Sequence, residues 1–306
     1  MKLLITGSSG MLGYALRDAF SKDASCNIAG MDLTPTKCGK KPSSFVKCDV
    51  TNYDKLTAAV KKIKPDTIIH AAAFTDVDGC ELDPDKAETA NGLGTRHIAE
   101  IARECNATLV YISTDFVFDG RKRVPYAEDD TPNPINVYGR SKLDGERFIK
   151  EIMKEKSYFI IRTSWIFGPG GKNFVDTIIK NAQNAKNLKV VSDQFGSPTY
   201  TLDLASAVKR LLEIAAQRRI SRGVYHITNN DDCSWYKLAQ KTLEYYRIYD
   251  VELIPIVSDE LDRPAERPRM SVLDNNRYIK LSGKPLRNWN RALEDYILLK
   301  RRGKDV

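Results

Sequence analysis

The stretch KLLITGSSGMLG, residues 2–13, decides the fold class of this chain. Its first part, KLLIT, is a short apolar run typical of a buried β-strand, and the pattern that begins at Met11, MLGYALRDAF, is typical of an amphipathic helix. Gly7, Gly10 and Gly13 follow the strand and enter the helix, where they allow the backbone to approach a bound group closely. Backbone amides at such a helix start can receive a phosphate or pyrophosphate.

The glycine spacing is G-x-x-G-x-x-G, slightly longer than the dinucleotide-binding fingerprint G-x-G-x-x-G. Asp32 ends the next apolar run, where a carboxylate accepts hydrogen bonds from an adenosine ribose. We interpret the loop as a dinucleotide site; the alternative is that the glycines serve only turn geometry and helix packing. A carboxylate at this position favours NAD, but a 2′-phosphate could be received by the residues that follow, Thr34, Thr36, Lys37, Lys40 and Lys41. The choice between NADPH and NADH therefore stays open.

Short apolar runs alternate with amphipathic patterns through the first half of the chain. After the first strand and helix come NIAGMD, YDKLTAAVKKI, DTIIHAA, GTRHIAEIAREC, TLVYIST and YFIIRTS. Strands that are apolar on both faces and separated by helices are typical of a parallel sheet covered on both sides. We predict an α/β fold, a Rossmann-type doubly wound parallel sheet with a smaller, interleaved C-terminal substrate-binding region.

The pattern loosens after Arg162, where Gly and Pro clusters separate the helical patterns at 174–185, 201–216, 234–246 and 290–300. A smaller region that completes a cleft fits this pattern better than a second independent domain. We predict a dinucleotide-binding domain over residues 1–165, to which residues 197–228 return, and a substrate-binding region formed by residues 166–196 and 229–306.

Composition excludes several classes of protein. The formal net charge is +8, but the 48 Lys and Arg residues are dispersed among 40 Asp and Glu residues. This dispersal favours a solvated basic surface first, and an anionic small substrate next, over nucleic acid. The six cysteines form no C-x-x-C pair and the three histidines are far apart, so neither a disulfide framework nor a zinc site is indicated. The absence of a long apolar run and of a signal-peptide pattern predicts a cytoplasmic protein without a membrane partner.

The segment VYGRSK places Tyr138 and Lys142 four residues apart, on one face of an expected helix. A glycine-rich first turn, a strand-end Ser/Thr in YISTDFVFDG and then Tyr-x-x-x-Lys resemble, in this order, the extended short-chain dehydrogenase/reductase superfamily. Within it the chain resembles the dTDP-4-dehydrorhamnose reductases, through STDFVFDG (113–120), YGRSKLDGE (138–146), RTSWIFG (162–168), DQFGSPT (193–199) and RPRMSVLD (267–274). The resemblance implies an NADPH- or NADH-dependent oxidoreductase that reduces the 4-keto group of a dTDP-deoxysugar, as in dTDP-4-dehydro-β-L-rhamnose to dTDP-β-L-rhamnose.

The resemblance gives Thr114, Tyr138 and Lys142 the catalytic roles together. Tyr138 is the expected proton donor, and a nearby cation is expected to lower the pKa of its phenol from about 10. Lys142 supplies that cation and can hold the nicotinamide ribose, while Thr114 donates a second hydrogen bond to the carbonyl oxygen. The alternative is a surface Tyr and Lys pair beside a strand-end Thr.

The remaining candidate residues bind cofactor or substrate. The predicted cofactor-binding residues are Gly7, Gly10, Met11, Leu12, Gly13, Asp32, Asp49, Val50, Ala71, Ala72, Ala73, Asn91, Tyr138 and Lys142. The resemblance places the substrate against Thr114, Asp115, Phe116, Tyr138, Trp165, Gln194, Thr199 and Arg267, with the Arg267 guanidinium suited to a diphosphate. Simple packing is the alternative for the alanines and for Trp165, a helix cap for Asn91, and a solvated loop for Arg267.

The chain departs from related families at two positions, and two other functions compete with the reductase. Some members of the resembled family carry a glutamate for a magnesium-bridged dimer where this chain has Ala15, so we predict no metal and leave the oligomeric state open, with a homodimer as one option. Thr114-Asp115 is followed by Phe116, not the glutamate of sugar-nucleotide dehydratases, which argues against elimination chemistry. The competing functions are a non-catalytic subunit like the regulatory subunit of methionine adenosyltransferase and a sugar-nucleotide epimerase.

Overall fold

The computed structural model describes residues 1–36 and 38–302; Lys37, named above as a candidate for a 2′-phosphate, lies outside the described residues. Within them, a seven-stranded sheet has the order β11-β6-β5-β4-β1-β2-β3, and every neighbouring pair is parallel. Its strands are β1 (Lys2–Thr6), β2 (Asn27–Asp32), β3 (Ser44–Lys47), β4 (Thr67–His70), β5 (Thr108–Thr114), β6 (Tyr158–Thr163) and β11 (Arg222–His226). The order reverses between β1 and β4, the kind of position at which doubly wound sheets bind dinucleotides. The predicted fold class is confirmed.

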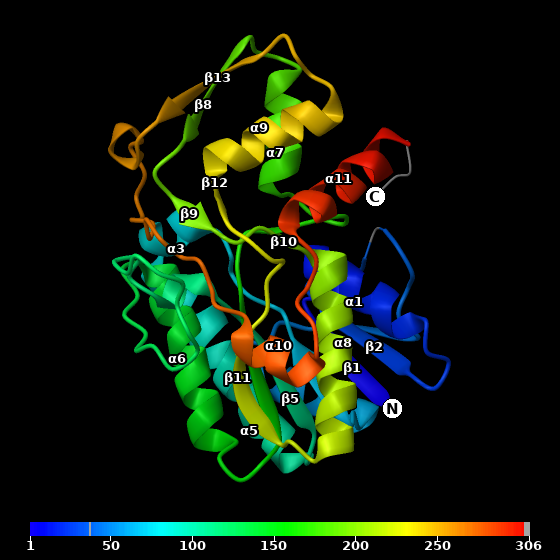
Figure 1. Cartoon of the computed structure of the whole chain (residues 1–306). Coiled ribbons are helices and arrows are strands. Elements are labelled where there is room, and N and C mark those ends of the chain that lie inside the picture. The colour runs from blue at the N-terminus through cyan, green and yellow to red at the C-terminus, as the bar shows by residue number, and fades with distance from the viewer. Residues whose placement is uncertain (37, 303–306) are drawn as a thin grey trace.

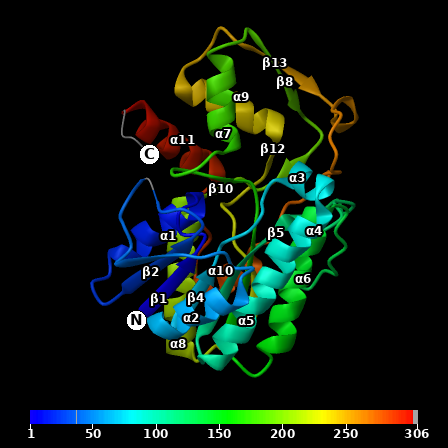
Figure 2. The same ribbon diagram turned by 180° about the vertical axis from the view of Figure 1, so that it is seen from behind.

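Helices cover both faces of this sheet (Figures 1 and 2). Alternate residues of the strands other than the edge strand β3 enter opposite cores: in β1, Leu3 and Ile5 pack on one face and Leu4 on the other. The first core is shared with α1 (Met11–Ser21), α8 (Thr201–Arg218) and α10 (Asn276–Ser282). The second is shared with α2 (Tyr53–Ile63), α5 (Gly94–Glu104) and α6 (Val137–Ile152). Burial on both faces explains why the strands have continuous apolar sequences.

A smaller region lies beyond the carboxyl ends of these strands and carries short two-stranded sheets (Figure 1). The pairs are β10 (Thr199–Tyr200) with β7 (Ile166–Phe167), β12 (Cys233–Ser234) with β9 (Phe195–Gly196), and β13 (Glu252–Ile256) with β8 (Asn187–Val191). Its helices are α7 (Phe174–Ala182), α9 (Trp235–Tyr246) and α11 (Trp289–Arg301), close to the predicted helical ranges. An aromatic core that includes Phe167, Tyr200 and Tyr296 joins them.

The chain crosses between the two parts more than once. After β7 and β8 it returns to the large sheet through α8, which packs on α1, and through β11, which pairs with β6. Residues of α10 return again, because Tyr278 and Leu281 join the core beneath α8. The predicted substrate-binding region, 229–306, therefore contributes one helix to the sheet layer. The division of the chain into two domains stays our proposal.

The segment between β4 and α5 carries α3 (Val77–Leu82), α4 (Pro84–Ala87) and the π-helix η1 (Glu88–Leu93). The turn after β5 is the 3₁₀-helix η2 (Asp115–Val117), and η3 (Ser258–Glu260) follows β13. None of the described helices combines the length and apolarity needed to cross a membrane.

Candidate active site

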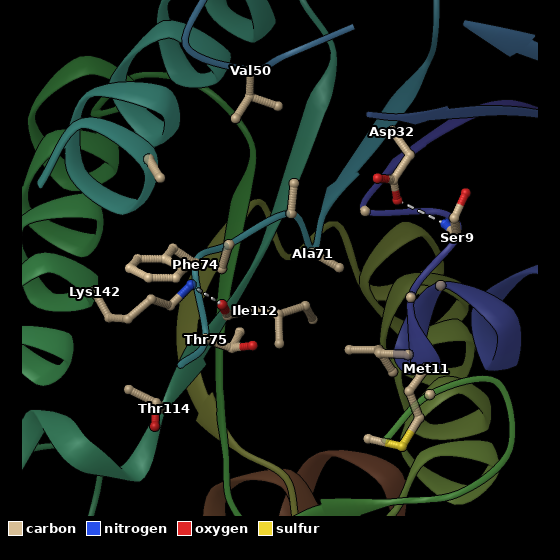
Figure 3. Close-up of a pocket in the computed structure, with 18 of the residues that line it drawn as sticks. Ser9, Met11, Asp32, Val50, Ala71, Phe74, Thr75, Ile112, Thr114 and Lys142 are labelled. Carbon is tan, nitrogen blue, oxygen red and sulfur yellow. Dashed lines mark hydrogen bonds between the residues drawn. The ribbon is translucent and has the colours of Figure 1, made fainter. Parts of the chain in front are cut away.

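A cavity of about 1130 Å³ lies at the carboxyl ends of β1, β2, β4, β5 and β6. Figure 3 shows Asp32 and Ser9 at one end of it and Thr114 and Lys142 at the other, with Ala71 between them. Nearly all the predicted cofactor residues line this cavity, as do Thr114, Asp115 and Trp165 from the predicted substrate set. The structure thus gathers on one surface residues that are more than 150 positions apart in sequence, from Gly7 to Trp165.

The glycine-rich loop is built so that two of its positions cannot carry a side chain. Gly7 has a φ of 68°, and a Cβ there would lie 2.7 Å from the backbone of Ala71. A Cβ on Gly13 would lie 2.2 Å from the carbonyl oxygen of Gly7. Gly10 is the N-cap of α1, and the first turn of this described helix carries no acidic residue. The loop is therefore an open cradle at a positive helix end, which suits a pyrophosphate.

Asp32 faces this cradle from the end of β2. One oxygen, Oδ2, accepts a hydrogen bond from the Ser9 backbone N–H at 2.9 Å, and Oδ1 accepts one from Leu33 N–H at 2.7 Å. Each carboxylate oxygen has a further acceptor site for a ribose hydroxyl. Of the residues considered for a 2′-phosphate, Thr34 lines the cavity, whereas the Thr36 hydroxyl accepts a hydrogen bond from the buried Arg17.

The loop after β4 carries the predicted alanines 71–73, all of which line the cavity. Asn91 holds this loop: its amide nitrogen donates to the Phe74 carbonyl and to the Ser141 hydroxyl, and its amide oxygen accepts from Phe74 N–H. The alternative role of Asn91 as a cap at a helix start is wrong, because the residue lies inside η1. Its side chain instead bridges to the loop after β4 and to α6. Its predicted contact with the cofactor stays a prediction.

Thr114 and Tyr138 lie on the wall opposite the glycines. Thr114 is buried at the end of β5, and its hydroxyl donates to Asp115 Oδ1 at 3.0 Å and accepts from Phe116 N–H at 3.2 Å. Tyr138 belongs to the first turn of α6, which Asn136 caps through Gly139 N–H. The Phe116 ring packs edge-to-face on the Tyr138 ring, with centroids 5.8 Å apart. The short loop and the helix cap therefore set where both hydroxyls lie.

Lys142 follows Tyr138 by one helical turn, but its ammonium group is directed to strand β5. Its Nζ donates to the Ile112 carbonyl at 2.7 Å, a bond visible in Figure 3, and lies 4.2 Å from the centre of the Tyr111 ring. Burial lowers the pKa of Lys142 to about 7, although Glu146 acts in the opposite direction. The expected lowering of the Tyr138 pKa is wrong for this arrangement, because burial and then the Asp115 carboxylate raise it.

A buried ion pair supports this wall from behind. Arg162 of β6 donates to both carboxylate oxygens of Glu146 in α6, at 2.9 and 2.7 Å, and the Ser113 hydroxyl donates to the same carboxylate at 2.6 Å. Burial alone would raise the pKa of Glu146, but these donors outweigh it and hold the pKa below its usual value. The pair ties β5 and β6 to the helix that carries Tyr138 and Lys142.

Trp165 lies where the large sheet meets the smaller region. Its backbone φ of 45° is unusual for a bulky residue. Its indole stacks on that of Trp235 with centroids 3.5 Å apart and planes within 6° of parallel. Gly196 leaves room for this stack, because a Cβ there would lie 2.4 Å from the Trp165 ring. The ring is thus held at the cavity wall by residues from β9 and α9.

Gln194 and Arg267 line a second, smaller cavity of about 320 Å³, together with Ser258, Arg263 and Arg269. The Gln194 amide donates to the Ser258 hydroxyl at 2.9 Å. Arg267 donates with both terminal nitrogens to Asp78 of α3, each at 2.6 Å. Arg267, the residue predicted to bind the diphosphate, is therefore already paired with the carboxylate of Asp78.

One predicted substrate residue remains, and the cavity also has lining residues that the sequence motifs did not indicate. Thr199 is fully buried and donates to the Ser197 carbonyl, so its predicted substrate contact stays a prediction. Sequence reasoning missed cavity-lining residues such as Phe74, Thr75 and Lys172. The first two directly follow the predicted alanines and could have been found by extending that motif. Lys172 ends a Gly-rich loop whose approach to α1 is a tertiary contact, since a Cβ on Gly171 would lie 2.8 Å from Met11.

An open glycine cradle at the reversal point of a Rossmann sheet, facing a Tyr-x-x-x-Lys helix and a strand-end Thr, defines a protein of the extended short-chain dehydrogenase/reductase type. The family described as RmlD substrate binding domain matches residues 1–301. The spore coat polysaccharide biosynthesis protein SpsK of Bacillus subtilis is 38% identical, covering 97% of this chain and 96% of that protein. A dTDP-4-dehydrorhamnose reductase of Streptomyces griseus is 37% identical, covering 95% and 91%.

A solved structure of dTDP-4-dehydrorhamnose reductase from Bacillus anthracis, in complex with NADP, superposes with a TM-score of 0.86 at 35% identity, covering 97% of this chain and 98% of that one. The chain belongs to the dTDP-4-dehydrorhamnose reductase family. The resemblance found in its sequence motifs is confirmed.

Proposed function

We propose that the protein reduces the 4-keto group of a nucleotide-diphospho-deoxysugar with NADPH or NADH, in particular dTDP-4-dehydro-β-L-rhamnose to dTDP-β-L-rhamnose. The observation that carries this proposal is the placement of Thr114, Tyr138 and Lys142 on the wall of the cavity that the glycine-rich loop also lines. The similarity to the dTDP-4-dehydrorhamnose reductase of Streptomyces griseus and the NADP bound to the Bacillus anthracis enzyme support it.

The described residues fit a nicotinamide dinucleotide. The amides at the start of α1 would hold the pyrophosphate, Asp32 the adenosine ribose, and Asp49 and Val50 the adenine. Alanines 71–73 leave room along the cavity floor, where larger side chains would fill it. Asp32 favours NADH by charge, and the bound NADP of the Bacillus anthracis relative favours NADPH; steady-state kinetics with each cofactor decide between them.

When bound, the reduced nicotinamide supplies the hydride that the carbonyl carbon accepts. The chain's own part is to hold the ketone and to protonate the oxygen that becomes negative. Tyr138 donates that proton; because its pKa is raised, the phenol carries it throughout the neutral range. Thr114 donates a hydrogen bond to the same oxygen. Tyr138 is left as a phenolate; Lys142 passes a proton to it and is itself reprotonated from solvent. Lys142 also holds the nicotinamide ribose.

The substrate's sugar would lie against Trp165 and Phe116, whose rings flank the catalytic wall. Its diphosphate and base would extend toward the smaller cavity, where Gln194 and Arg267 belong. Arginine binds two phosphate oxygens at once, so a diphosphate can compete with Asp78 for the guanidinium. Thr199 would shape this wall through the β7–β10 pair.

We also propose that the protein works in the cytoplasm and without nucleic acid. Its basic residues are spread over the surface and many are paired with acids, for example Arg277 with Asp129 and Arg287 with Asp203. Dispersed, neutralised cations give a weak attraction for a phosphate backbone. A homodimer is the assembly we propose to test, by light scattering on the purified protein.

The test is an assay with NADPH or NADH and dTDP-4-dehydro-L-rhamnose generated in place, following nicotinamide oxidation. Tyr138→Phe should lower kcat about 10²- to 10⁴-fold while leaving cofactor affinity nearly intact, because only the proton donor is removed. Tyr249→Phe is the matched control, since Tyr249 is 77% exposed. An active Tyr138→Phe variant would remove Tyr138 from the donor role.

Two other outcomes would replace the proposal. Cofactor binding without turnover of any 4-keto sugar nucleotide would favour a regulatory subunit. NAD that copurifies and does not exchange, with the hydride returned to the product, would favour an epimerase.

A further inference from the structure

Asp115 is a buried carboxyl on the wall of the main cavity. It follows Thr114 directly and opens η2. Only 2% of its surface is exposed. Oδ1 accepts the hydrogen bond from Thr114, whereas Oδ2 has no hydrogen-bond partner among the described residues. A buried carboxylate with one oxygen unpartnered is costly to charge.

The hydroxyl of Thr114 has a single proton to give. It already accepts from Phe116 N–H, so one acceptor site and one donor remain. If Asp115 is charged, the Thr114 proton is committed to Asp115 Oδ1 and cannot be donated to a substrate ketone. If Asp115 carries a proton on Oδ1, the same 3.0 Å contact reverses direction and the Thr114 proton becomes available.

Burial favours the neutral form of Asp115 and outweighs the hydrogen-bond donors that face it. Tyr138 faces it from α6, and the Ser271 hydroxyl faces it from the segment before α10. Cys80 of α3 acts on Tyr138, whose pKa it raises. The ammonium of Lys142 is directed away, to the Ile112 carbonyl. Burial raises the pKa of Asp115 to about 7, and the hydrogen bonds from Ser271 and Thr114 offset this only in part.

We propose that Asp115 is a positioning residue that works in its neutral form: it donates to the Thr114 hydroxyl and thereby directs the Thr114 proton to the carbonyl oxygen of the substrate. The inference rests on the proposed reductase function and deepens it. Two hydrogen bonds in series polarise each other, so the chain from Asp115 through Thr114 strengthens the second donor at the developing alkoxide. No proton leaves Asp115 during the reaction.

The sign of the pH effect follows from this arrangement. The carboxyl is neutral below pH 7 and charged above it, so its contribution to kcat/KM should be lost as pH rises. The amide of an Asp115→Asn variant donates to Thr114 at every pH. The ratio of kcat/KM for Asp115→Asn over wild type should therefore rise about tenfold between pH 6 and pH 8. Titration of Lys142 is common to both proteins and cancels in this ratio.

The experiment measures this ratio in the wild-type background and in a Thr114→Val background. We expect the rise in the first and a constant ratio in the second, because no hydroxyl remains to be directed. Asp144→Asn, a partly exposed residue of the same helix as Tyr138, is the control and should give a constant ratio. A constant ratio for Asp115→Asn, or a folded Asp115→Asn variant that is inactive at every pH, would overturn the proposal.

The protonation state of the carboxyl can also be measured without turnover and without variants. Infrared difference spectra of the wild-type protein should show the carbonyl band of a protonated carboxyl at pH 6 that is lost by pH 8. Absence of that band at pH 6 would overturn the inference even with an active enzyme. Wild-type protein that binds cofactor and shows the band, but reduces no 4-keto sugar nucleotide, would refute the proposed function instead.

Discussion

The two sides of the main cavity differ in composition: one is mainly backbone and small residues, and the other is mainly large side chains. The cofactor side consists largely of backbone and small residues held between β1, β4 and α1, where the atoms around Gly7 and Gly13 are fixed by the sheet. The substrate side consists of large side chains that hold one another, such as Trp165 on Trp235 and Arg267 on Asp78. Between them lies the catalytic wall, which a buried Arg162–Glu146 pair connects to both β5 and β6.

This contrast explains how each side can recognise its ligand. A backbone cradle offers donors whose positions do not depend on side-chain rotamers, so it can bind a constant group such as a pyrophosphate. Paired side chains can exchange partners, and we propose that a diphosphate replaces Asp78 on Arg267 in this way. We therefore expect changes on the cofactor side to act on folding and cofactor binding together, and changes on the substrate side to act on KM.

The largest effect should come from the buried pair behind the catalytic wall. Glu146→Ala leaves Arg162 charged and unpaired in the core and should cost about 3–5 kcal/mol of unfolding free energy. Because the Glu146 pKa is lowered in the folded protein, the stabilisation is present above the ordinary pKa of a glutamate and is lost as pH falls. Urea unfolding measures it, with the exposed Glu151→Ala on the same helix as control. Equal stability of the two variants would contradict the role of the pair.

The cradle should be nearly as sensitive. Gly13→Ala forces a Cβ against the Gly7 carbonyl and should cost about 3 kcal/mol while also removing cofactor binding. Gly10→Ala is the matched control for folding, since a Cβ there meets its nearest atom at 3.5 Å. Thermal unfolding and cofactor titration of both variants check this. A Gly13→Ala protein as stable as Gly10→Ala would show that the cradle can relax and would weaken the contrast between the two sides.

On the substrate side, Trp235→Ala should free the Trp165 ring. We expect a loss of about 2 kcal/mol, less than for a fully buried tryptophan because Trp235 is partly exposed, and a KM for the sugar nucleotide raised about tenfold. The cofactor Kd should not change. Trp235→Phe keeps an aromatic surface for stacking and should restore most of the KM. An equal loss of cofactor affinity would mean that the two sides are not separable.

The smallest effect should come from the Arg267–Asp78 pair of the substrate side. Asp78→Asn removes one charge from the contact with Arg267 and should cost about 1 kcal/mol at low salt, because the pair is partly exposed. The Arg267 hydrogen bonds lower the pKa of Asp78, so the stabilisation is present at neutral pH and disappears as pH falls below that of an ordinary aspartate. Asp259→Asn, which breaks a more exposed pair with Arg269, should have no measurable effect. Denaturant unfolding at two salt concentrations distinguishes them.

Much of the cofactor side could be predicted from sequence because its signals are local. Gly7, Gly10 and Gly13 lie within one strand–loop–helix unit, and Asp32 ends the next strand, so the fold class fixes where they meet. Tyr138 and Lys142 are likewise one helical turn apart. The substrate side could be predicted only through resemblance, since Gln194 and Arg267 come together from distant segments.

The doubly wound sheet, the glycine cradle and the Tyr-x-x-x-Lys helix can all be inferred from the sequence, because strand and helix periodicities and short motifs are properties of neighbouring residues. Which polar and charged groups of the cavity are paired, and which are buried away from water, depends on the tertiary structure. The tertiary structure directed Lys142 to the Ile112 carbonyl, raised the pKa of Tyr138 and buried Asp115 with one oxygen unpartnered among the described residues. Charge states in a cavity depend on burial and on partners far apart in the chain, and these exist only once the chain has folded.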